Sequence, residues 1–401
     1  DGDTIFVSNG TYIENINFIG KNIALIGENR ETTIIDGNEG ESVVKFVSGE
    51  DENARIMGFT LRNGFGHFDF TDSTVLDTTP FIGGGMLLLD SSPKIEDLKI
   101  VNNRARAGAG IYMFNSDPHI FDVLISDNYT DTVALGNVGG GLCLASSSPH
   151  ISHSVITNNN SSWYGGGLIA ANNSSPTITH SNFVNNSALV GNEIVTGDDS
   201  SIFSNGSGIV TIINSVIYND RIYDDPNTMT QDIDIVGGPN ITYSFVSDGH
   251  EGEGNIGTTP YFCDLDNGDL TLAANSPLLG SGENGSNIGA FGVGCDPITT
   301  SSEYGGIVSK EFTLHQNYPN PFNPLTTVRY DLPEEGFISI IIYDMMGRVV
   351  KTLVNGSQTA GFKTIQWNAT NDRNEPVSAG LYIYRLQAGE FRQTKKMVFV
   401  K

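Results

Sequence analysis

One pattern recurs four times in the middle of the chain. Its copies are GGGMLLLDSSPKIEDLKIVNN at 83–103, GAGIYMFNSDPHIFDVLISDN at 108–128, GGGLCLASSSPHISHSVITNN at 139–159 and GGGLIAANNSSPTITHSNFVNN at 165–186. Measured between their prolines, successive copies are 25, 31 and 27 residues apart. A period of this length indicates a solenoid of stacked repeats. The asparagines that end the copies are expected to form a ladder at one turn, consisting of Asn103, Asn128, Asn159 and Asn186.

The residues after each glycine run decide between two kinds of solenoid. A leucine-rich repeat also fits the run from Ile95 to Asn103, but its chain would return through a helix. Here the return alternates apolar residues at period two, as in Met86 and Leu88, which indicates a strand. The proline that follows ends that strand, because proline cannot donate a hydrogen bond to a sheet. With weaker flanking copies, about a dozen coils are expected between Asp1 and Cys295, in an all-β parallel β-helix.

Composition excludes several classes of partner. The chain has 401 residues and a formal net charge of −25, from 21 basic and 46 acidic residues. A phosphate backbone needs a basic surface, so neither nucleic acid nor an anionic membrane surface is expected as a partner. No run of about 18 apolar residues is present, so no membrane-spanning segment is expected. Three cysteines without a CxxC pair predict neither a disulfide scaffold nor a zinc site.

The glycine-rich strand, the Ser-Ser-Pro bend, the isoleucine core and the asparagine turn together resemble the right-handed parallel β-helix superfamily, which includes the pectate-lyase-like proteins. The stretch at 2–28 resembles the first coils of such domains, and the stretch at 260–292 resembles their last coils. The resemblance implies a right-handed β-helix over residues 1–296, truncated at its N-terminus because Asp1 stands in mid-pattern. It implies a fold far more specifically than an activity.

A different module follows a polar linker at 297–311. From residue 312 to 401 the sequence alternates in short strands separated by turns, which predicts a small Ig-like β-sandwich. An ordered set of its residues resembles the type A C-terminal sorting domain of the bacterial type IX secretion system. The set comprises Asn317, Pro319, Asn320, Pro321, Phe322, Asn323, Pro324, Gly347, Arg348, Trp367, Gly380, Tyr382, Tyr384, Lys396 and Met397. The resemblance implies export by the type IX machinery of a Bacteroidetes-like bacterium, with cleavage in the linker; an ordinary Ig-like or carbohydrate-binding sandwich is the alternative.

Candidate catalytic residues are scarce. In a polysaccharide lyase of this superfamily, Arg104 or Arg106 would be the base beside a Ca²⁺ ion, although arginines at turns are more often solvated. Asp198 and Asp199 resemble one part of the polygalacturonase pattern, whose companion motifs are absent from the chain. The loop from Asp264 to Asp269 resembles a calcium site, but its glycine stands one position early, which favours a turn. We therefore expect no catalytic residue, no metal and no cofactor.

The histidines and two of the cysteines are expected to be structural. His150, His153 and His180 stand at repeated bends, with a spacing that suits neither zinc nor a catalytic triad, so exposed turn positions are expected. Cys263 and Cys295 bracket the expected last coil. An exported protein reaches an oxidising compartment, so a disulfide between these two cysteines is expected.

Repeat lengths vary at one place, the segment that follows the asparagine turn. Insertions at one register of a solenoid stack on one edge, which is often its binding edge. Aromatic residues in these insertions are expected to form a ligand-binding edge: Phe65, Phe68, Phe70, Phe81, Tyr129, Trp163 and Tyr164. Flat rings beside amide and acidic groups suit the faces and hydroxyls of sugars. The alternative is that the rings fold back and cover the side of the β-helix.

The sequence therefore predicts an exported β-helix protein, secreted or attached to the outer surface, with a binding or adhesion role. Polysaccharide is the expected ligand. Two alternatives stay open: a polysaccharide lyase or glycoside hydrolase of the same superfamily, and a structural stalk of a larger surface protein.

Overall fold

The computed structural model divides into two compact units, residues 1–298 and 299–401. Its regular structure is almost entirely strand, and the described residues contain only two short 3₁₀ helices. No helix in this part of the chain is long and apolar enough to cross a membrane. The structure describes residues 1–66, 81–130, 137–196, 208–219, 235–247, 249–298, 312–317, 320–324, 326–358, 361–373, 375–389 and 391–400.

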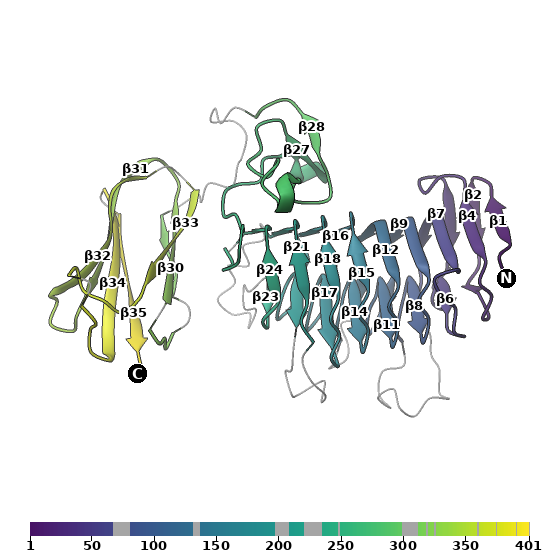
Figure 1. Cartoon of the computed structure of the whole chain (residues 1–401), viewed down its shortest axis with the longest axis horizontal. Coiled ribbons are helices and arrows are strands. Elements are labelled where there is room, and N and C mark those ends of the chain that lie inside the picture. Colours follow the sequence, from purple (N-terminus) through teal and green to yellow (C-terminus); the bar gives the residue numbers. More distant parts are fainter. Residues whose placement is uncertain are drawn as a thin grey trace. The chain divides into compact units, whose positions relative to one another are not determined.

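The first unit is a parallel β-helix whose coils contribute three rows of strands, each strand paired with its copy in the next coil (Figure 1). The first row consists of β1 (Thr4–Val7), β4 (Ala24–Gly27), β7 (Arg55–Arg62), β9 (Lys94–Val101), β12 (His119–Ser126), β15 (His150–Ser152), β18 (Thr177–Thr179), β21 (Thr211–Ile213) and β24 (Asn240–Thr242). The second row consists of β2 (Gly10–Ile13), β5 (Thr33–Asp36), the second halves of β7, β9 and β12, then β16 (Val155–Thr157), β19 (Asn182–Val184), β22 (Val216–Tyr218) and β25 (Phe245–Val246).

The third row carries the period-two pattern that follows the glycine runs. It consists of β3 (Ile16–Asn17), β6 (Val44–Phe46), β8 (Met86–Leu89), β11 (Ile111–Phe114), β14 (Leu142–Ala145), β17 (Leu168–Ala171), β20 (Ile194–Thr196) and β23 (Ile235–Val236). A short additional pair, β10 (Arg104–Ala105) with β13 (Tyr129–Thr130), follows the asparagine turn. The strands predicted from the alternation at period two are therefore present, and they pair in parallel.

Left-handed residues redirect the chain at several places in each coil, and two of these places border the second row. Those between the first and second rows have φ angles between 45° and 80°: Gly58, Asp97, Asp122, His153, His180, Asn214 and Tyr243. The left-handed residues at the end of the second row have φ angles between 54° and 57°: Asn63, Asn102, Asp127, Asn158 and Asn185. Apart from glycine, Asn, Asp and His adopt this conformation most readily. Because the flanking strands are in register, each set stacks in a column, which we call the bend column and the turn column.

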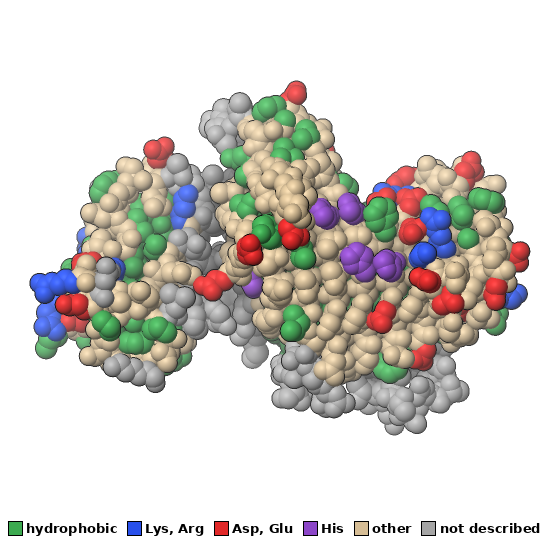
Figure 2. All heavy atoms as spheres, viewed as in Figure 1, with side chains coloured by type: hydrophobic (Ala, Val, Ile, Leu, Met, Phe, Trp, Pro, Cys, Tyr) green, Lys and Arg blue, Asp and Glu red, His purple; other side chains and the backbone are tan. Residues whose placement is uncertain are grey.

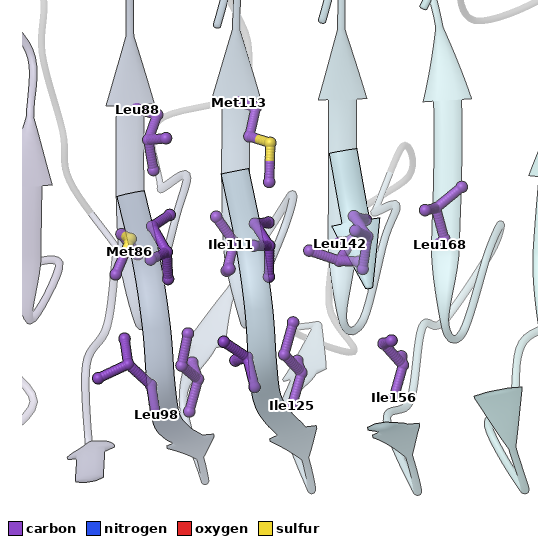
Figure 3. Close-up of a cluster of buried hydrophobic side chains, with 14 of the residues drawn as sticks. Met86, Leu88, Leu98, Ile111, Met113, Ile125, Leu142, Ile156 and Leu168 are labelled. Carbon is purple, nitrogen blue, oxygen red and sulfur yellow. The ribbon is translucent and has the colours of Figure 1, made fainter. Parts of the chain in front are cut away.

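Apolar side chains fill the interior of the coils. Figure 3 shows how those of the third row follow one another from coil to coil: Met86, Ile111, Leu142 and Leu168. Ile125 and Ile156 approach them from the second row, and all of these side chains are fully buried. Burying a side chain of this size stabilises a fold by about 1.5–3 kcal/mol. The stacked interior is therefore the main source of stability of the β-helix.

The outer face of the third row is apolar as well. Leu87, Tyr112, Cys143, Ile169 and Val195 point away from the interior yet are buried in a second cluster. Burial raises the pKa of the Cys143 thiol to about 12, so this free cysteine is not a nucleophile near neutral pH. The described part of this face therefore serves packing.

The residues expected to form the last coil form a separate lobe instead, which corrects the expectation from sequence. The lobe contains β26 (Phe262–Asp264), the 3₁₀ helix η1 (Leu265–Asn267), β27 (Asp269–Ala273), η2 (Glu283–Gly285) and β28 (Val293–Cys295). Strands β26 and β27 pair antiparallel. Their connection is too short for the crossover that parallel strands require, so they cannot stack as coils. A disulfide joins Cys263 to Cys295 across the lobe.

The second unit is an Ig-like β-sandwich of two antiparallel sheets. One sheet contains β29 (Thr313–Leu314), β30 (Thr326–Leu332) and β33 (Gly361–Trp367). The other contains β32 (Val349–Gln358), β31 (Gly336–Tyr343), β34 (Gly380–Ala388) and β35 (Phe391–Phe399). The predicted fold class, an all-β chain with a parallel β-helix followed by an Ig-like sandwich, is confirmed. Of the expected linker at 297–311, all but the first two residues lie outside the described residues.

Candidate binding surfaces

The asparagine ladder lies inside the β-helix. The Nδ2 atoms of Asn103, Asn128 and Asn159 each donate to the Oδ1 atom of the asparagine in the next coil, at 2.9 Å. The last member, Asn186, donates through Nδ2 to Oε2 of Glu193 at 2.5 Å. All of these side chains are fully buried. The ladder therefore satisfies polar groups at the turn and offers nothing to a ligand.

Three described aromatic residues of the predicted binding edge lie in the segments that follow the asparagine turn, at two different registers. Tyr129 pairs with Asn160 of the next coil, and Tyr164 belongs to a ladder of bridges with Val138 and Val190. Tyr129 is 44% exposed, whereas Trp163 is half-buried with its ring 5.8 Å from that of Tyr164. We call Tyr129, Trp163 and Tyr164 the aromatic edge.

The remaining aromatic candidates divide into two groups. The rings of Phe65 and Phe81 contact each other at 4.8 Å between centroids, and both are half-buried. This pair therefore matches the alternative in which the rings fold back onto the β-helix. Phe68 and Phe70 lie outside the described residues.

The two arginines considered as catalytic bases are half-buried, whereas arginines at turns were expected to be solvated. The Arg104 guanidinium lies over the Phe65 ring, 4.1 Å from its centroid, a stacking contact that holds the cation in place. The Nε atoms of Arg104 and Arg106 are both buried. Asp198 and Asp199 lie outside the described residues. Among the described residues, no three His, Cys, Asp or Glu side chains converge as a metal ligand set.

The acidic loop of the lobe is a hydrogen-bonded turn. The Asp264 carboxylate accepts hydrogen bonds from the Asn267 backbone N at 3.2 Å and from its Nδ2 atom at 2.8 Å. Asp269 accepts from the backbone N of Thr271 at 3.0 Å. Gly268 between them is left-handed, with φ of 80°. These contacts account for two of the loop's three carboxylates, and the third, Asp266, is exposed.

The lobe packs against the outer face of the second row and leaves a cleft of about 590 Å³ beside it. The backbone N of Gly289 donates to the carbonyl oxygen of Asn214 at 2.7 Å, and that of Ala290 donates to Oδ1 of Asn182 at 3.0 Å. Outward side chains of β12, β16 and β19 form the floor of the cleft: Leu124, Ser126, Val155, Thr157 and Val184. Sequence reasoning missed this cleft, because the coil residues and the lobe residues that line it lie at least 80 positions apart in the chain.

The rims of the cleft are largely polar, and three of their residues are acidic: Asp122, Asp127 and Asp266. The bend column contributes Asp122 and His153, and the turn column contributes Asp127, Asn158 and Asn185. The lobe contributes Leu265, Asp266, Asn267, Gly268, Leu270 and Phe291. At one end Arg30 forms ion pairs with Asp97 at 3.2 Å and with Asp122 at 3.3 Å.

Histidine side chains gather on the same face next to the lobe, as Figure 2 shows in purple. The rings of His153 and His180 stack at 5.1 Å with 11° between their planes, and those of His119 and His150 lie 5.4 Å apart. His150 and His180 are half-buried, so the expectation of exposed turn positions is wrong for these two. Burial, followed by the neighbouring imidazole, lowers the pKa of each. The sequence signal was the histidine that follows proline in two successive repeats.

In the second unit, six of the fourteen described motif residues meet in one core. Phe322 lies between Trp367 and Phe399, with ring centroids 5.4 and 5.2 Å away. The backbone N of Asn317 donates to the Tyr384 hydroxyl at 2.7 Å, and that hydroxyl donates to the His315 carbonyl oxygen. Tyr382 packs edge-on against Trp367, and Met397 is fully buried beside them.

The other motif residues lie at turns and strand ends. Gly347 is left-handed in the β31–β32 turn, where Arg348 donates through Nε to Asp344 at 2.7 Å. Oδ1 of Asn320 accepts from the backbone N of Val398 at 2.8 Å. Asn323 and Lys396 are exposed, and Gly380 is the first residue of β34. Pro321 and Pro324 each follow a cis peptide bond and are exposed as well. Pro319 lies outside the described residues.

The comparisons with known proteins bear on both units. The model of the FlgD Ig-like domain family matches residues 326–390. Among solved structures, the chain is similar to dimeric latent PorU from Porphyromonas gingivalis, at 21% identity and a TM-score of 0.20 over 27% of this chain and 10% of that one. It is also similar to PorZ, a surface component of the type-IX secretion system of the same bacterium, at 18% identity and a TM-score of 0.18 over 24% of this chain and 13% of PorZ.

Pectin methylesterase from Yersinia enterocolitica is similar at 17% identity and a TM-score of 0.35, over 56% of this chain and 76% of that one. The chain thus spans only a small part of PorU and PorZ but most of this pectin methylesterase. No curated protein sequence matches the chain.

Proposed function

We propose that the second unit is a type IX sorting signal and that it delivers the β-helix to the outer surface or the medium. What supports the proposal is the structural unity of the motif: Asn317, Phe322, Trp367 and Tyr384 come from distant segments and meet in one core. The similarity of residues 326–390 to an Ig-like domain agrees with a separately folded signal.

A transfer experiment tests the sorting role. Residues 299–401 are fused to a periplasmic reporter in a bacterium that has a type IX system, and the full chain is expressed beside a version that ends at residue 298. The reporter and the full chain should reach the surface or the medium, and the shortened chain should stay in the periplasm. If the shortened chain reaches the surface at normal levels, the second unit is not the sorting signal.

We further propose that the β-helix binds polysaccharide at the aromatic edge. The observation that carries this proposal is the exposed ring of Tyr129 on one coil beside the segment that holds Trp163 on the next. The two coils are joined there, because the backbone N of Ser162 donates to Thr130 Oγ1 at 2.9 Å. Aromatic faces stack on the apolar faces of sugar rings, and the exposed part of these rings is available for such contacts.

Affinity electrophoresis in gels that contain neutral or acidic polysaccharides tests the binding role. Replacing Tyr129 and Trp163 together by Ala should abolish retardation and leave the melting temperature nearly unchanged. Phe6→Ala is the matched control, because Phe6 is a 78% exposed aromatic residue of the first coil. A double variant that loses several degrees of stability and is still retarded would show that the rings only pack. Release of unsaturated or reducing sugar ends would instead support a lyase or hydrolase.

A further inference from the structure

We propose that the cleft between the second row and the lobe is a separate binding site for a short, uncharged oligosaccharide. The inference rests on the proposed function only in taking a glycan as the ligand. Its site, its charge preference and its dependence on the lobe are independent of the aromatic edge.

The cleft is built as a small-molecule site. Its volume of about 590 Å³ lies within the range of about 300–1,000 Å³ that is common for such sites. The floor comes from three successive coils, so its side chains repeat at about 4.8 Å along the groove. Leu124, which is half-buried, and Val155, which is 7% exposed, give the floor apolar surface that can lie against the C–H face of a sugar.

Hydrogen-bonding groups border this apolar floor on both sides. Asp127 on the turn column and Asp266 on the lobe are exposed carboxylates, and Thr157 on the floor carries a hydroxyl between the rims. A carboxylate has two oxygens and accepts hydrogen bonds from adjacent hydroxyls. Phe291 of the lobe, 37% exposed, adds an aromatic surface at the wall. An apolar floor between polar rims is the chemistry that recognises a sugar ring.

Charge decides which glycans fit. The cleft is lined by three carboxylates, those of Asp122, Asp127 and Asp266, against the single guanidinium of Arg30. That guanidinium is already paired with Asp97 and Asp122. Residues 1–298 as a whole carry 10 basic and 37 acidic side chains, a formal charge of −27. Uronic acids and sulfated sugars are therefore repelled, and uncharged sugars are favoured.

The disulfide stabilises the lobe, which forms one wall of the cleft. Cys263 in β26 and Cys295 in β28 are joined, and these strands flank β27 beside the η1 turn that carries Asp266. The lobe is anchored on the second row through Asn182 and Asn214. Removing the disulfide should loosen the wall and weaken binding in the cleft. It should leave the aromatic edge, which begins at Tyr129 beyond the buried Asn128 of the turn, unaffected.

Isothermal titration of the full chain tests the proposal with four probes: cellotetraose, laminaritetraose, mannotetraose and tetragalacturonic acid. At least one uncharged probe should bind, and the tetragalacturonate should not. Replacing Asp127 and Asp266 together by Asn should weaken that binding at least tenfold. Asn suits the left-handed position of Asp127, because Asn102 and Asn158 occupy it in the neighbouring coils. Asp90→Asn is the matched control, since Asp90 is an exposed left-handed residue on another corner with Asn115 stacked beside it.

Two further variants separate this site from the aromatic edge. Cys263→Ser with Cys295→Ser should weaken binding of the tetrasaccharide, whereas Tyr129→Ala with Trp163→Ala should not change it. The proposed binding site is wrong if no uncharged probe binds at millimolar concentration or if tetragalacturonate binds better than the uncharged probes. It is also wrong if the Asp127/Asp266 variant binds like the wild type. Loss of polysaccharide retardation in the edge variant alone would uphold the proposed function without the cleft.

Discussion

Asn159 shows how one side chain supports three coils. Its Oδ1 atom accepts from the Asn128 amide, and its Nδ2 atom donates to Asn186 and to the carbonyl oxygen of Ile125 at 2.8 Å. Asn159→Ala leaves several buried groups without partners, each at a cost of about 1–3 kcal/mol. We expect a loss of at least about 2 kcal/mol in the free energy of unfolding, measured by denaturant titration of the full chain. Asn240→Ala, at an exposed position of β24, should change it little.

The two half-buried histidines predict a pH dependence. Burial and a neighbouring imidazole lower the pKa of His150 and of His180 below the ordinary value of 6.5. The unfolded chain then takes up protons at a higher pH than the folded chain does. Stability is therefore complete above about pH 6.5 and is lost as the pH falls through the lowered values.

The melting temperature should accordingly fall between pH 7 and pH 5. The slope should shrink in His150→Thr with His180→Asn, because Thr177 and Asn214 occupy the corresponding positions of the following coils. An unchanged slope in this double variant would assign the pH dependence to other groups.

At the scale of the element, the glycine runs are explained by the spacing between coils. A Cβ on Gly166 would lie 2.5 Å from the backbone N and O of Ser187 and from the carbonyl oxygen of Asn192. Gly166→Ala should therefore cost about 1–3 kcal/mol through overpacking against the backbone of the next coil. A Cβ on Gly238 meets nothing within 4 Å, so Gly238→Ala is the control and should be nearly neutral. Equal melting temperatures of the two variants would contradict this account.

The elements also show what local pattern could predict. Alternation after the glycines identified the third row, and the repeat register identified the asparagine ladder, because both signals lie within one repeat. The lobe escaped prediction because the antiparallel pairing of β26 with β27 leaves no periodic signal in so short a segment. The cleft escaped because the contact between Asn182 and Ala290 joins residues 108 positions apart. The contact of Arg104 with Phe65 likewise depends on how two coils stack.

For the whole molecule, the two units differ in charge. The −27 of residues 1–298 contrasts with 11 basic and 9 acidic side chains, a formal charge of +2, in residues 299–401. The excess of negative charge thus belongs to the first unit alone. A strongly acidic surface keeps a protein soluble and repels polyanions. If the proposed glycan binding holds, the charge of the whole first unit should disfavour acidic glycans, as the carboxylates of the cleft do.

The last prediction concerns export and depends on the folded state of the second unit. Trp367 is 1% exposed, packs against Phe322 and Tyr382, and donates through Nε1 to the Thr370 carbonyl oxygen. Trp367→Ala should cost about 3–5 kcal/mol and unfold this unit. If the folded unit is the sorting signal, the variant should accumulate in the periplasm with a protease-resistant β-helix. Phe337→Ala, at a 62% exposed position of β31, should be exported like the wild type. The prediction is wrong if Trp367→Ala reaches the surface at wild-type levels although protease cleaves its second unit in vitro. Export would then not require the folded state of this unit.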